Sequence, residues 1–277
     1  NQLVRVTRQT VSGPEISAAD GTYVRFEHAG GTAFGMLDGG EVSELDGDPI
    51  GGNASPTGQT FNVSDVELGL PVNPAKPGRK VLAAAANYQP TNAPPRQVPH
   101  PRYLFKRSTA LSADGGDVER PQEVEMFIPE GELVIVIGRS GRHIPVNEVN
   151  DYIFGVAAGN DWSELSWITA GSGPRPLKYV SKATDTWAGL ANRIVRGIDY
   201  SDLQITTRVN GELLSQGQHL LELAAWARGA PCAVLCCVLC PVRASRRPLA
   251  PPQSKLQGED GVCKTHIAVV GVMLCIC

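Results

Sequence analysis

Two glutamates at the start of an apolar run could together bind a metal ion. Glu130 and Glu132 are separated by one residue and lead into the continuous apolar run 133–137. In a strand, side chains at this spacing leave the same face, about 7 Å apart at a rise of about 3.3 Å per residue. Carboxylates beside such a strand are costly to bury unless a cation compensates them, and Mg²⁺, Mn²⁺ and Ca²⁺ prefer oxygen ligands. The pair therefore suits a divalent-metal site, while two solvated charges at a strand edge are the alternative.

A third carboxylate follows about one strand–helix–strand excursion later. Asp161 lies in the segment 159–163, where small residues predict a turn. If the turn returns to the start of the apolar run, Asp161 joins the two glutamates as a further oxygen ligand.

The elements that would position these residues are mostly short strands. The run 130–138 is β-branched and continuously apolar, which predicts a strand buried on both faces. Residues 145–152 begin with proline and contain acidic residues, which predicts a short helix. Further strands are expected at 80–86, 103–106 and 203–209, with a hairpin turn at Asn210-Gly211.

The N-terminal part reads as a separate small β module. Residues 22–50 alternate like strands and are interrupted by Gly and Asp, which predicts antiparallel hairpins. The Pro-rich passage 71–77 is taken as a linker. We therefore expect a module and linker over 1–76, a main domain over 77–218, and a separate tail over 219–277.

Composition excludes several classes of function. The 25 basic and 28 acidic residues leave a net charge of −3, so the chain has no electrostatic footprint for nucleic acid. The apolar runs are shorter than the roughly 20 residues of a membrane-spanning helix. All seven cysteines follow residue 231, so the body has no disulfide framework. This favours a reducing compartment, the cytoplasm, with the mitochondrion left open because the sequence begins at Asn1 rather than Met.

Six segments of the chain form a recognisable series. They are KVLAAAANY (80–88), LFKRSTAL (104–111), GELVIVIGR (131–139), YIFGVAAGNDWS (152–163), KATDT (182–186) and RIVRGIDYSDLQITTRVNGELLSQ (193–216). In order and spacing they resemble the fumarylacetoacetate hydrolase family, over roughly residues 22–218. The resemblance implies an α+β, β-rich mixed β-roll preceded by a small N-terminal β module. It implies a divalent metal, Mg²⁺ or alternatively Mn²⁺ or Ca²⁺, held by Glu130, Glu132 and Asp161.

The same resemblance implies a small 2-oxo or diketo acid as substrate, which the metal would chelate. The expected reaction is C–C cleavage, hydration or decarboxylation by a hydrolase or lyase, and a homodimer is left open. Lys182 matches a family lysine near the substrate oxygens, where an ammonium could pair with a developing oxyanion. Tyr88 and Lys106 match positions that line the substrate pocket. For all three, an ordinary role on the surface or at a strand end is the alternative.

The chain departs from the family pattern at three positions of the expected substrate site. Thr91 stands where members carry a histidine, and threonine is no general base near neutral pH. His100 lies nearby as a substitute or as a simple loop histidine. Leu165 and Ile168 replace an arginine and a glutamine, so neither can pair with a substrate carboxylate. These changes favour an alternative, a non-catalytic metal-binding relative or a vestigial product.

The tail departs further, because none of the family's closing strands is recognisable after residue 218. Three interpretations are open for its seven-cysteine sequence: a translated intron or misjoined exon, a membrane-associated or palmitoylated segment, and a zinc site. Cys237 and Cys240 have C-x-x-C spacing, with Cys263 and His266 downstream, but a matching second C-x-x-C pair is missing. The first interpretation predicts a domain that lacks its closing strands.

Overall fold

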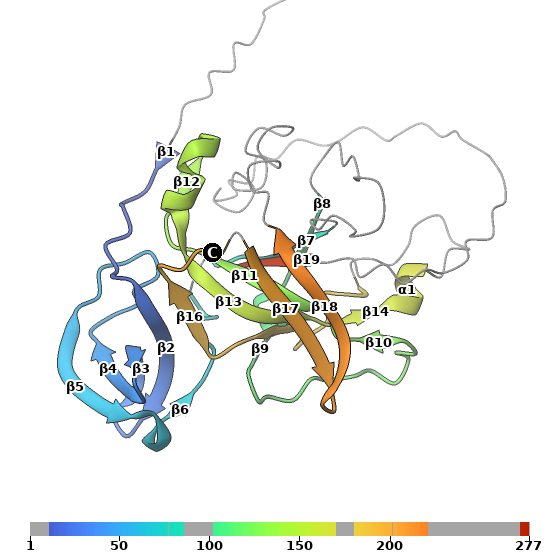
Figure 1. Ribbon diagram of the computed structural model, residues 1–277, viewed down its shortest axis with the longest axis horizontal. Helices are drawn as coiled ribbons and strands as arrows, with labels where there is room; N and C mark the ends of the chain where they lie inside the picture. The colour runs from blue at the N-terminus through green and yellow to red at the C-terminus, as the bar shows by residue number, and fades with distance from the viewer. Residues whose placement is uncertain are drawn as a thin grey trace, which may run out of the picture.

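The computed structural model of the chain describes residues 11–76, 78–85, 102–169, 180–200, 202–220 and 272–276. Most of its strands join one mixed sheet (Figure 1). Along the sheet the strands follow the order β5-β4-β3-β2-β16-β13-β11-β19-β7-β8. The β-rich α+β architecture expected from the sequence is confirmed.

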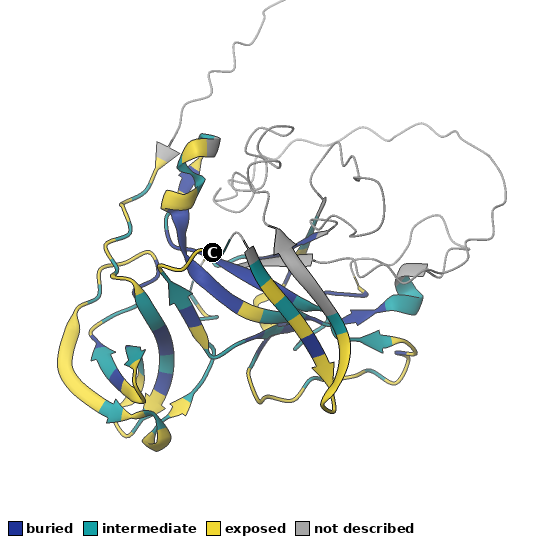
Figure 2. Cartoon of the chain, in the orientation of Figure 1, coloured by how far each residue is buried: buried dark blue, intermediate teal, exposed yellow. Residues whose placement is uncertain are grey.

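The N-terminal end of the sheet is an antiparallel meander. It comprises β2 (Gly21–His28), β3 (Gly31–Asp38), β4 (Glu41–Leu45) and β5 (Pro56–Asn62). The alternating pattern places Val24, Phe26 and Val42 in a small core of their own, while β5 is almost entirely exposed (Figure 2). The hairpins were expected from the sequence. Strand β5 was not, because its residues are polar and carry no apolar alternation.

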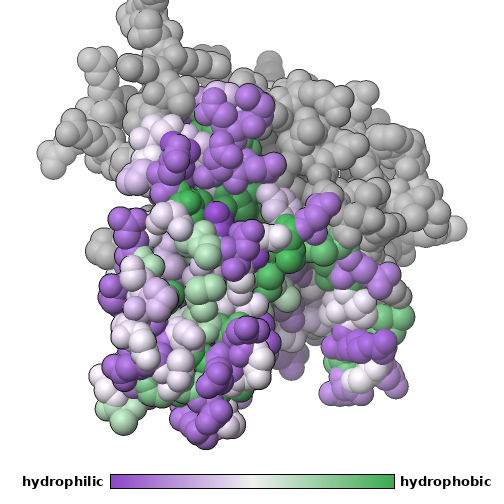
Figure 3. Space-filling view, turned by 60° about the vertical axis from the view of Figure 1, so that its left-hand side comes forward, coloured by the Kyte–Doolittle hydropathy of each residue, from purple (hydrophilic) through white to green (hydrophobic). Residues whose placement is uncertain are grey.

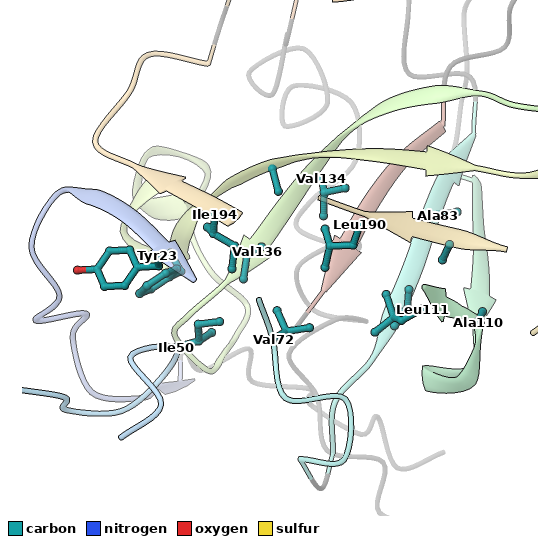
Figure 4. Packing of buried hydrophobic residues seen from close by; sticks show 14 of the residues in the cluster. Tyr23, Ile50, Val72, Ala83, Ala110, Leu111, Val134, Val136, Leu190 and Ile194 are labelled. Atoms are coloured by element: carbon teal, nitrogen blue, oxygen red, sulfur yellow. The ribbon is translucent and has the colours of Figure 1, made fainter. Parts of the chain in front are cut away.

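The centre of the sheet is formed by β11 (Gly131–Ile137) and β13 (Ile153–Asp161), which pair antiparallel. Every residue of β11 after Gly131 is buried, as the continuous apolar run predicts. On one face Val134 and Val136 pack in the larger core with residues such as Leu190 and Val72 (Figure 4). A short 3₁₀-helix, η3 (Val146–Tyr152), follows Pro145 and leads into β13, where the sequence predicts a short helix.

A separate hairpin covers the other face of β11. Its strands are β17 (Asp202–Val209) and β18 (Glu212–Leu220), joined at Asn210 and Gly211, which both have positive φ as the Asn-Gly pair predicts. Leu203 and Ile205 pack against the core that contains Leu133 and Ile135. β11 is therefore enclosed from both sides, and the hairpin crosses in front of it in Figure 1.

Four further elements complete the frame of the site: β7 (Val81–Ala85), β8 (Arg102–Lys106), β15 (Ala188–Leu190) and β16 (Arg193–Arg196). β16 joins the meander to β13, because it pairs with both β2 and β13. In the space-filling view, polar side chains cover much of the visible surface of the described residues (Figure 3). Among these residues, no helix is long and apolar enough to cross a membrane.

The end of the chain supplies a strand that the sequence did not predict. β19 (Val272–Ile276) lies between β11, to which it is parallel, and β7, to which it is antiparallel. From the sequence, no closing strand was expected after residue 218. The apolar composition of 272–276 is typical of a strand inside a sheet, yet a run of five residues is too short for its periodicity to identify it as a strand.

Candidate active site

The pairing of β11 with β13 brings Glu130 and Asp161 opposite each other. The amide of Asp161 donates to the Glu130 carbonyl at 2.8 Å, and the amide of Glu130 donates to Asn160 Oδ1 at 2.9 Å. Glu132 pairs with Gly159, one position further along the same face. Asp161 is the last residue of strand β13. The turn that the sequence predicts over 159–163 is therefore not where Asp161 lies. The three carboxylates nevertheless emerge from one face of the sheet.

Lys182 lies between two of these carboxylates. Its ammonium donates to Asp161 Oδ2 at 2.8 Å and to Glu130 Oε2. Ser163 Oγ donates to the same Glu130 oxygen at 3.0 Å. The Lys182 side chain is only 8% exposed, so this is a buried ion-pair network rather than a solvated surface pair.

Lys106, the last residue of β8, is the other lysine of the network and contacts Asp161. Its side chain is fully buried, and its ammonium lies 2.5 Å from Asp161 Oδ1. It also donates to the carbonyl oxygens of Lys182 and, at 2.9 Å, of Trp187. Lys106 therefore holds both Asp161 and the backbone of the 182–187 segment. Its ammonium is thus enclosed by two carbonyl acceptors and one carboxylate oxygen.

The network pairs two carboxylates, those of Glu130 and Asp161, with two ammonium groups, those of Lys106 and Lys182. Burial raises the pKa of Glu130, and Lys182 only partly opposes that rise. Burial alone would lower the pKa of Lys182, but Asp161 and Glu130 outweigh it and raise the pKa above its ordinary value. Burial lowers the pKa of Lys106, against the opposing effect of Asp161. Glu132, only 2% exposed, is a third buried carboxyl side chain on the same face of the sheet.

The donor set suits a hard divalent cation in its chemistry. Asp161 Oδ1 is buried and accepts no hydrogen bond of ordinary geometry, although the Lys106 ammonium lies close to it. Carboxylate oxygens are the ligands that Mg²⁺ and Mn²⁺ prefer. Within the described ranges, however, no three acidic, histidine or cysteine side chains converge as metal ligands would. The Lys182 ammonium lies between Glu130 and Asp161.

The structure describes only some of the remaining predicted site residues. Tyr88, Thr91 and His100 lie outside the described residues. Leu165 opens the single-turn helix α1 (Leu165–Thr169), to which Ile168 also belongs, and its amide donates to the Met126 carbonyl at 2.9 Å. The cysteines and the histidine of the proposed zinc site also lie outside the described residues. Of the other cysteines of the tail, Cys275 is in β19.

Two residues that shape the site, Ser163 and Glu164, were not predicted from the sequence. Ser163 donates to Glu130, and Glu164 is fully buried where it accepts hydrogen bonds from the amides of Met126 and Ser166. Glu164 thereby joins the segment before β10 (Phe127–Ile128) to the start of α1. Both lie within three residues of Asp161, which was the available signal, but a buried glutamate cannot be distinguished from an exposed one by sequence alone.

Two family models cover most of the body of the chain. Residues 72–223 match the fumarylacetoacetate (FAA) hydrolase C-terminal model. Residues 22–71 match the Rv2993c-like N-terminal model. The chain belongs to the fumarylacetoacetate hydrolase family. Enzymes of this family generally use a divalent metal, and they include isomerases, tautomerases and hydrolases.

Relatives of this family match different lengths of the chain. Oxaloacetate tautomerase YisK of Bacillus subtilis is 29% identical over 167 residues, or 57% of this chain and 53% of the relative. The match thus spans about half of that relative's length. Protein Rv2993c of Mycobacterium tuberculosis is 30% identical over 214 residues, or 70% of this chain and 74% of the relative.

A solved relative supports the same assignment in three dimensions. The crystal structure of 5-carboxymethyl-2-hydroxymuconate delta-isomerase from Mycobacterium smegmatis superposes with a TM-score of 0.63 at 27% identity. The superposition covers 75% of this chain and 82% of that one. The fumarylacetoacetate hydrolase fold is therefore common to both.

Proposed function

We propose that this fumarylacetoacetate hydrolase family member is a divalent-metal-dependent enzyme that acts on a small 2-oxo or diketo acid. The observation that carries the proposal is the pair of buried carboxylates Glu130 and Asp161, which Lys182 joins, with the Glu132 carboxylate on the same face of the sheet. Carboxylate oxygens of this kind are the ligands that Mg²⁺ and Mn²⁺ prefer. Glu130, Glu132 and Asp161 are the residues that would hold the metal, with Mg²⁺ or Mn²⁺ as the expected ion.

The roles of the chain's own residues follow from their contacts. When bound, a divalent cation supplies Lewis acidity toward the 2-oxo and carboxylate oxygens of such a substrate. Lys182 is the candidate to donate a hydrogen bond to the oxygen that gains charge as the substrate enolises. Lys106 positions rather than reacts, since its donors are engaged by Asp161 and two carbonyl oxygens. Ser163 orients the Glu130 carboxylate.

Keto–enol or double-bond isomerisation requires fewer catalytic groups from this chain than hydrolysis does. Hydrolysis requires an activated water, and Thr91 replaces the histidine that would serve this step in the family pattern. Proton transfer within a bound 2-oxo acid requires no water nucleophile. The names of the Bacillus tautomerase and the Mycobacterium isomerase agree with this preference. C–C cleavage and decarboxylation remain within the proposed range of reactions.

The test is turnover of oxaloacetate and of acylpyruvates by the purified chain with Mn²⁺ or Mg²⁺. Ultraviolet absorbance follows the enol of oxaloacetate, and coupled assays follow released pyruvate and the cleaved acid. We expect activity that chelator abolishes and that Glu132→Gln greatly reduces. Lys76→Gln is the matched control, because Lys76 pairs with Asp48 and has no contact with the site carboxylates. A folded, metal-binding chain that turns over none of these substrates would refute the catalytic proposal.

That last outcome would instead support a non-catalytic, metal-binding relative. Leu165 is the described residue that favours this second candidate, because an apolar side chain stands where the family pattern has an arginine for the substrate carboxylate. Leu165→Arg then becomes the discriminating variant. A gain of turnover in it would indicate that the metal site is intact and the substrate contact is what was lost.

A further inference from the structure

The two lysines of the network are anchored in different ways. Lys106 has a fully buried side chain, and two of its three donors reach backbone oxygens, those of Lys182 and Trp187. The Lys182 ammonium, by contrast, contacts only side chains among the described residues, the carboxylates of Glu130 and Asp161. Its side chain also keeps 8% of its surface exposed. One lysine is fixed in place, whereas the other is held only by the groups that a metal would take.

The anchoring of Lys106 has a consequence for Lys182. Because Lys106 donates to the Lys182 carbonyl, it fixes the backbone from which the Lys182 side chain extends. The Lys182 ammonium can therefore leave the two carboxylates by rotation about its own side-chain bonds, without movement of the 182–187 segment. A long, unbranched side chain has the rotamers for such a change.

We propose that Lys182 is a displaceable counter-ion. Its ammonium holds Glu130 and Asp161 until those carboxylates bind a divalent cation, and it is then free to face the substrate. This inference rests on the proposed function, because it assumes a metal at these carboxylates. It adds that metal binding has two effects at once: it fills the site and it releases the lysine that is to contact the substrate.

If Lys182 and the metal compete for the same carboxylates, the direction in which removal of the ammonium changes the metal affinity is fixed. A group that binds the same carboxylates as the metal weakens metal affinity by the free energy of its own contacts. Removal of the ammonium should therefore tighten metal binding. It should also destabilise the metal-free protein, in which the buried Glu130 carboxylate loses its ammonium partner. A lysine that merely supported the site would show the opposite sign for affinity.

The decisive experiment is calorimetric titration of Mn²⁺ into the wild type, Lys182→Gln and Lys182→Arg, with melting temperatures measured with and without Mn²⁺. We expect Lys182→Gln to bind Mn²⁺ about tenfold more tightly or better, the factor typical of losing one charge-assisted hydrogen bond. Its metal-free melting temperature should fall, so its rise on adding Mn²⁺ should exceed that of the wild type. Lys182→Arg keeps the charge and should bind no more tightly than the wild type. Lys76→Gln should match the wild type throughout.

The outcomes separate this inference from the proposed function. If the wild type binds Mn²⁺ and Lys182→Gln binds it equally or more weakly, the counter-ion inference is wrong and the metal site stands. If neither protein binds Mn²⁺, the proposed function fails and the inference falls with it. If Lys182→Gln folds only with Mn²⁺, as circular dichroism would reveal, the inference is supported. If it does not fold at all, Lys182→Arg decides, and Mn²⁺ binding tighter than that of the wild type would overturn the proposal.

A second measurement observes the release itself. Amidination of lysines, mapped by mass spectrometry, should label Lys182 faster once Mn²⁺ is bound. Lys106 serves as the internal control in the same molecule, since its fully buried ammonium should stay unlabelled under both conditions. Equal labelling of Lys182 with and without Mn²⁺ would contradict its displacement.

Discussion

Individual residues of the network differ in what they contribute, and Lys106 contributes stability. Its buried ammonium contacts Asp161 and donates to two carbonyl oxygens, those of Lys182 and Trp187. Lys106→Met should lower the free energy of unfolding by about 3 kcal/mol or more, the cost of removing one partner from a buried ion pair. Urea denaturation followed by circular dichroism measures the difference.

The neighbouring arginine provides the control for that prediction. Arg107 pairs with Asp185, and both side chains are about half exposed, at 62% and 48%. Arg107→Met should therefore change the free energy of unfolding by less than about 1 kcal/mol. Equal losses in the two variants would mean that Lys106 is not the buried anchor described above.

Glu164 gives a prediction about pH at the same scale. Burial alone would raise the pKa of its carboxyl, but hydrogen bonds from the Ser166 hydroxyl and from backbone amides outweigh burial and lower it. A carboxyl whose pKa is lower in the folded than in the unfolded state stabilises the fold above the unfolded value. That stability is lost as the pH falls through the folded value.

We therefore expect the wild type to lose stability below about pH 4, the ordinary range of a glutamate. Glu164→Gln should be less stable at neutral pH, since an amide oxygen accepts fewer hydrogen bonds and its NH₂ group faces donors. The gap between the two melting temperatures should narrow on acidification. A gap between the two melting temperatures that stays constant as the pH is lowered from neutral to well below the ordinary pKa of a glutamate would rule out this linkage.

At the scale of elements, the packing of the β17–β18 hairpin on β11 depends on a glycine between the two glutamates. A Cβ on Gly131 would lie 2.3 Å from Thr207 Oγ1, which accepts a hydrogen bond from the Gly131 amide at 3.2 Å. Gly131→Ala should therefore push the hairpin away and cost about 1–3 kcal/mol through overpacking. Adding Thr207→Ala should recover part of that loss, because the Thr207 Cβ would lie at an ordinary 3.5 Å. Additive losses in a double-mutant cycle would exclude this contact as the cause.

The strands of the site were largely predictable, and their partners were not. The apolar run 133–137 and the i, i+2 glutamates identify a buried strand with two carboxylates on one face, as β11 has. The β13 register that sets Asp161 opposite Glu130 depends on tertiary pairing, which no local pattern encodes. The ion pairs with Lys182 were equally hidden, because 52 residues separate it from Glu130. Local propensity thus predicts elements, whereas long-range pairing determines the site.

For the whole molecule, the strand that joins the two halves of the main sheet comes from the end of the chain. β19 lies between β11 and β7, so without it both strands would present unpaired edges in the middle of the sheet. On its other side β7 pairs with β8, which carries Lys106. The position of Lys106 relative to β11 and β13 therefore depends on residues 272–276, far outside the range that matches the family model.

This arrangement predicts that a backbone change in β19 reaches the whole sheet. Leu274 pairs with Val134 on one side and Ala83 on the other, so a proline there removes a ladder hydrogen bond within a central strand. Leu274→Pro should lower the free energy of unfolding by more than about 2 kcal/mol, as expected for an unmade buried hydrogen bond with added strand distortion. It should also weaken Mn²⁺ binding, because Lys106 would lose its fixed place behind Asp161. Cys277→Pro, placed after the strand, should leave both quantities unchanged. Wild-type stability and Mn²⁺ affinity in Leu274→Pro would show that the sheet closes without β19, and the site would then depend only on the residues of the family match.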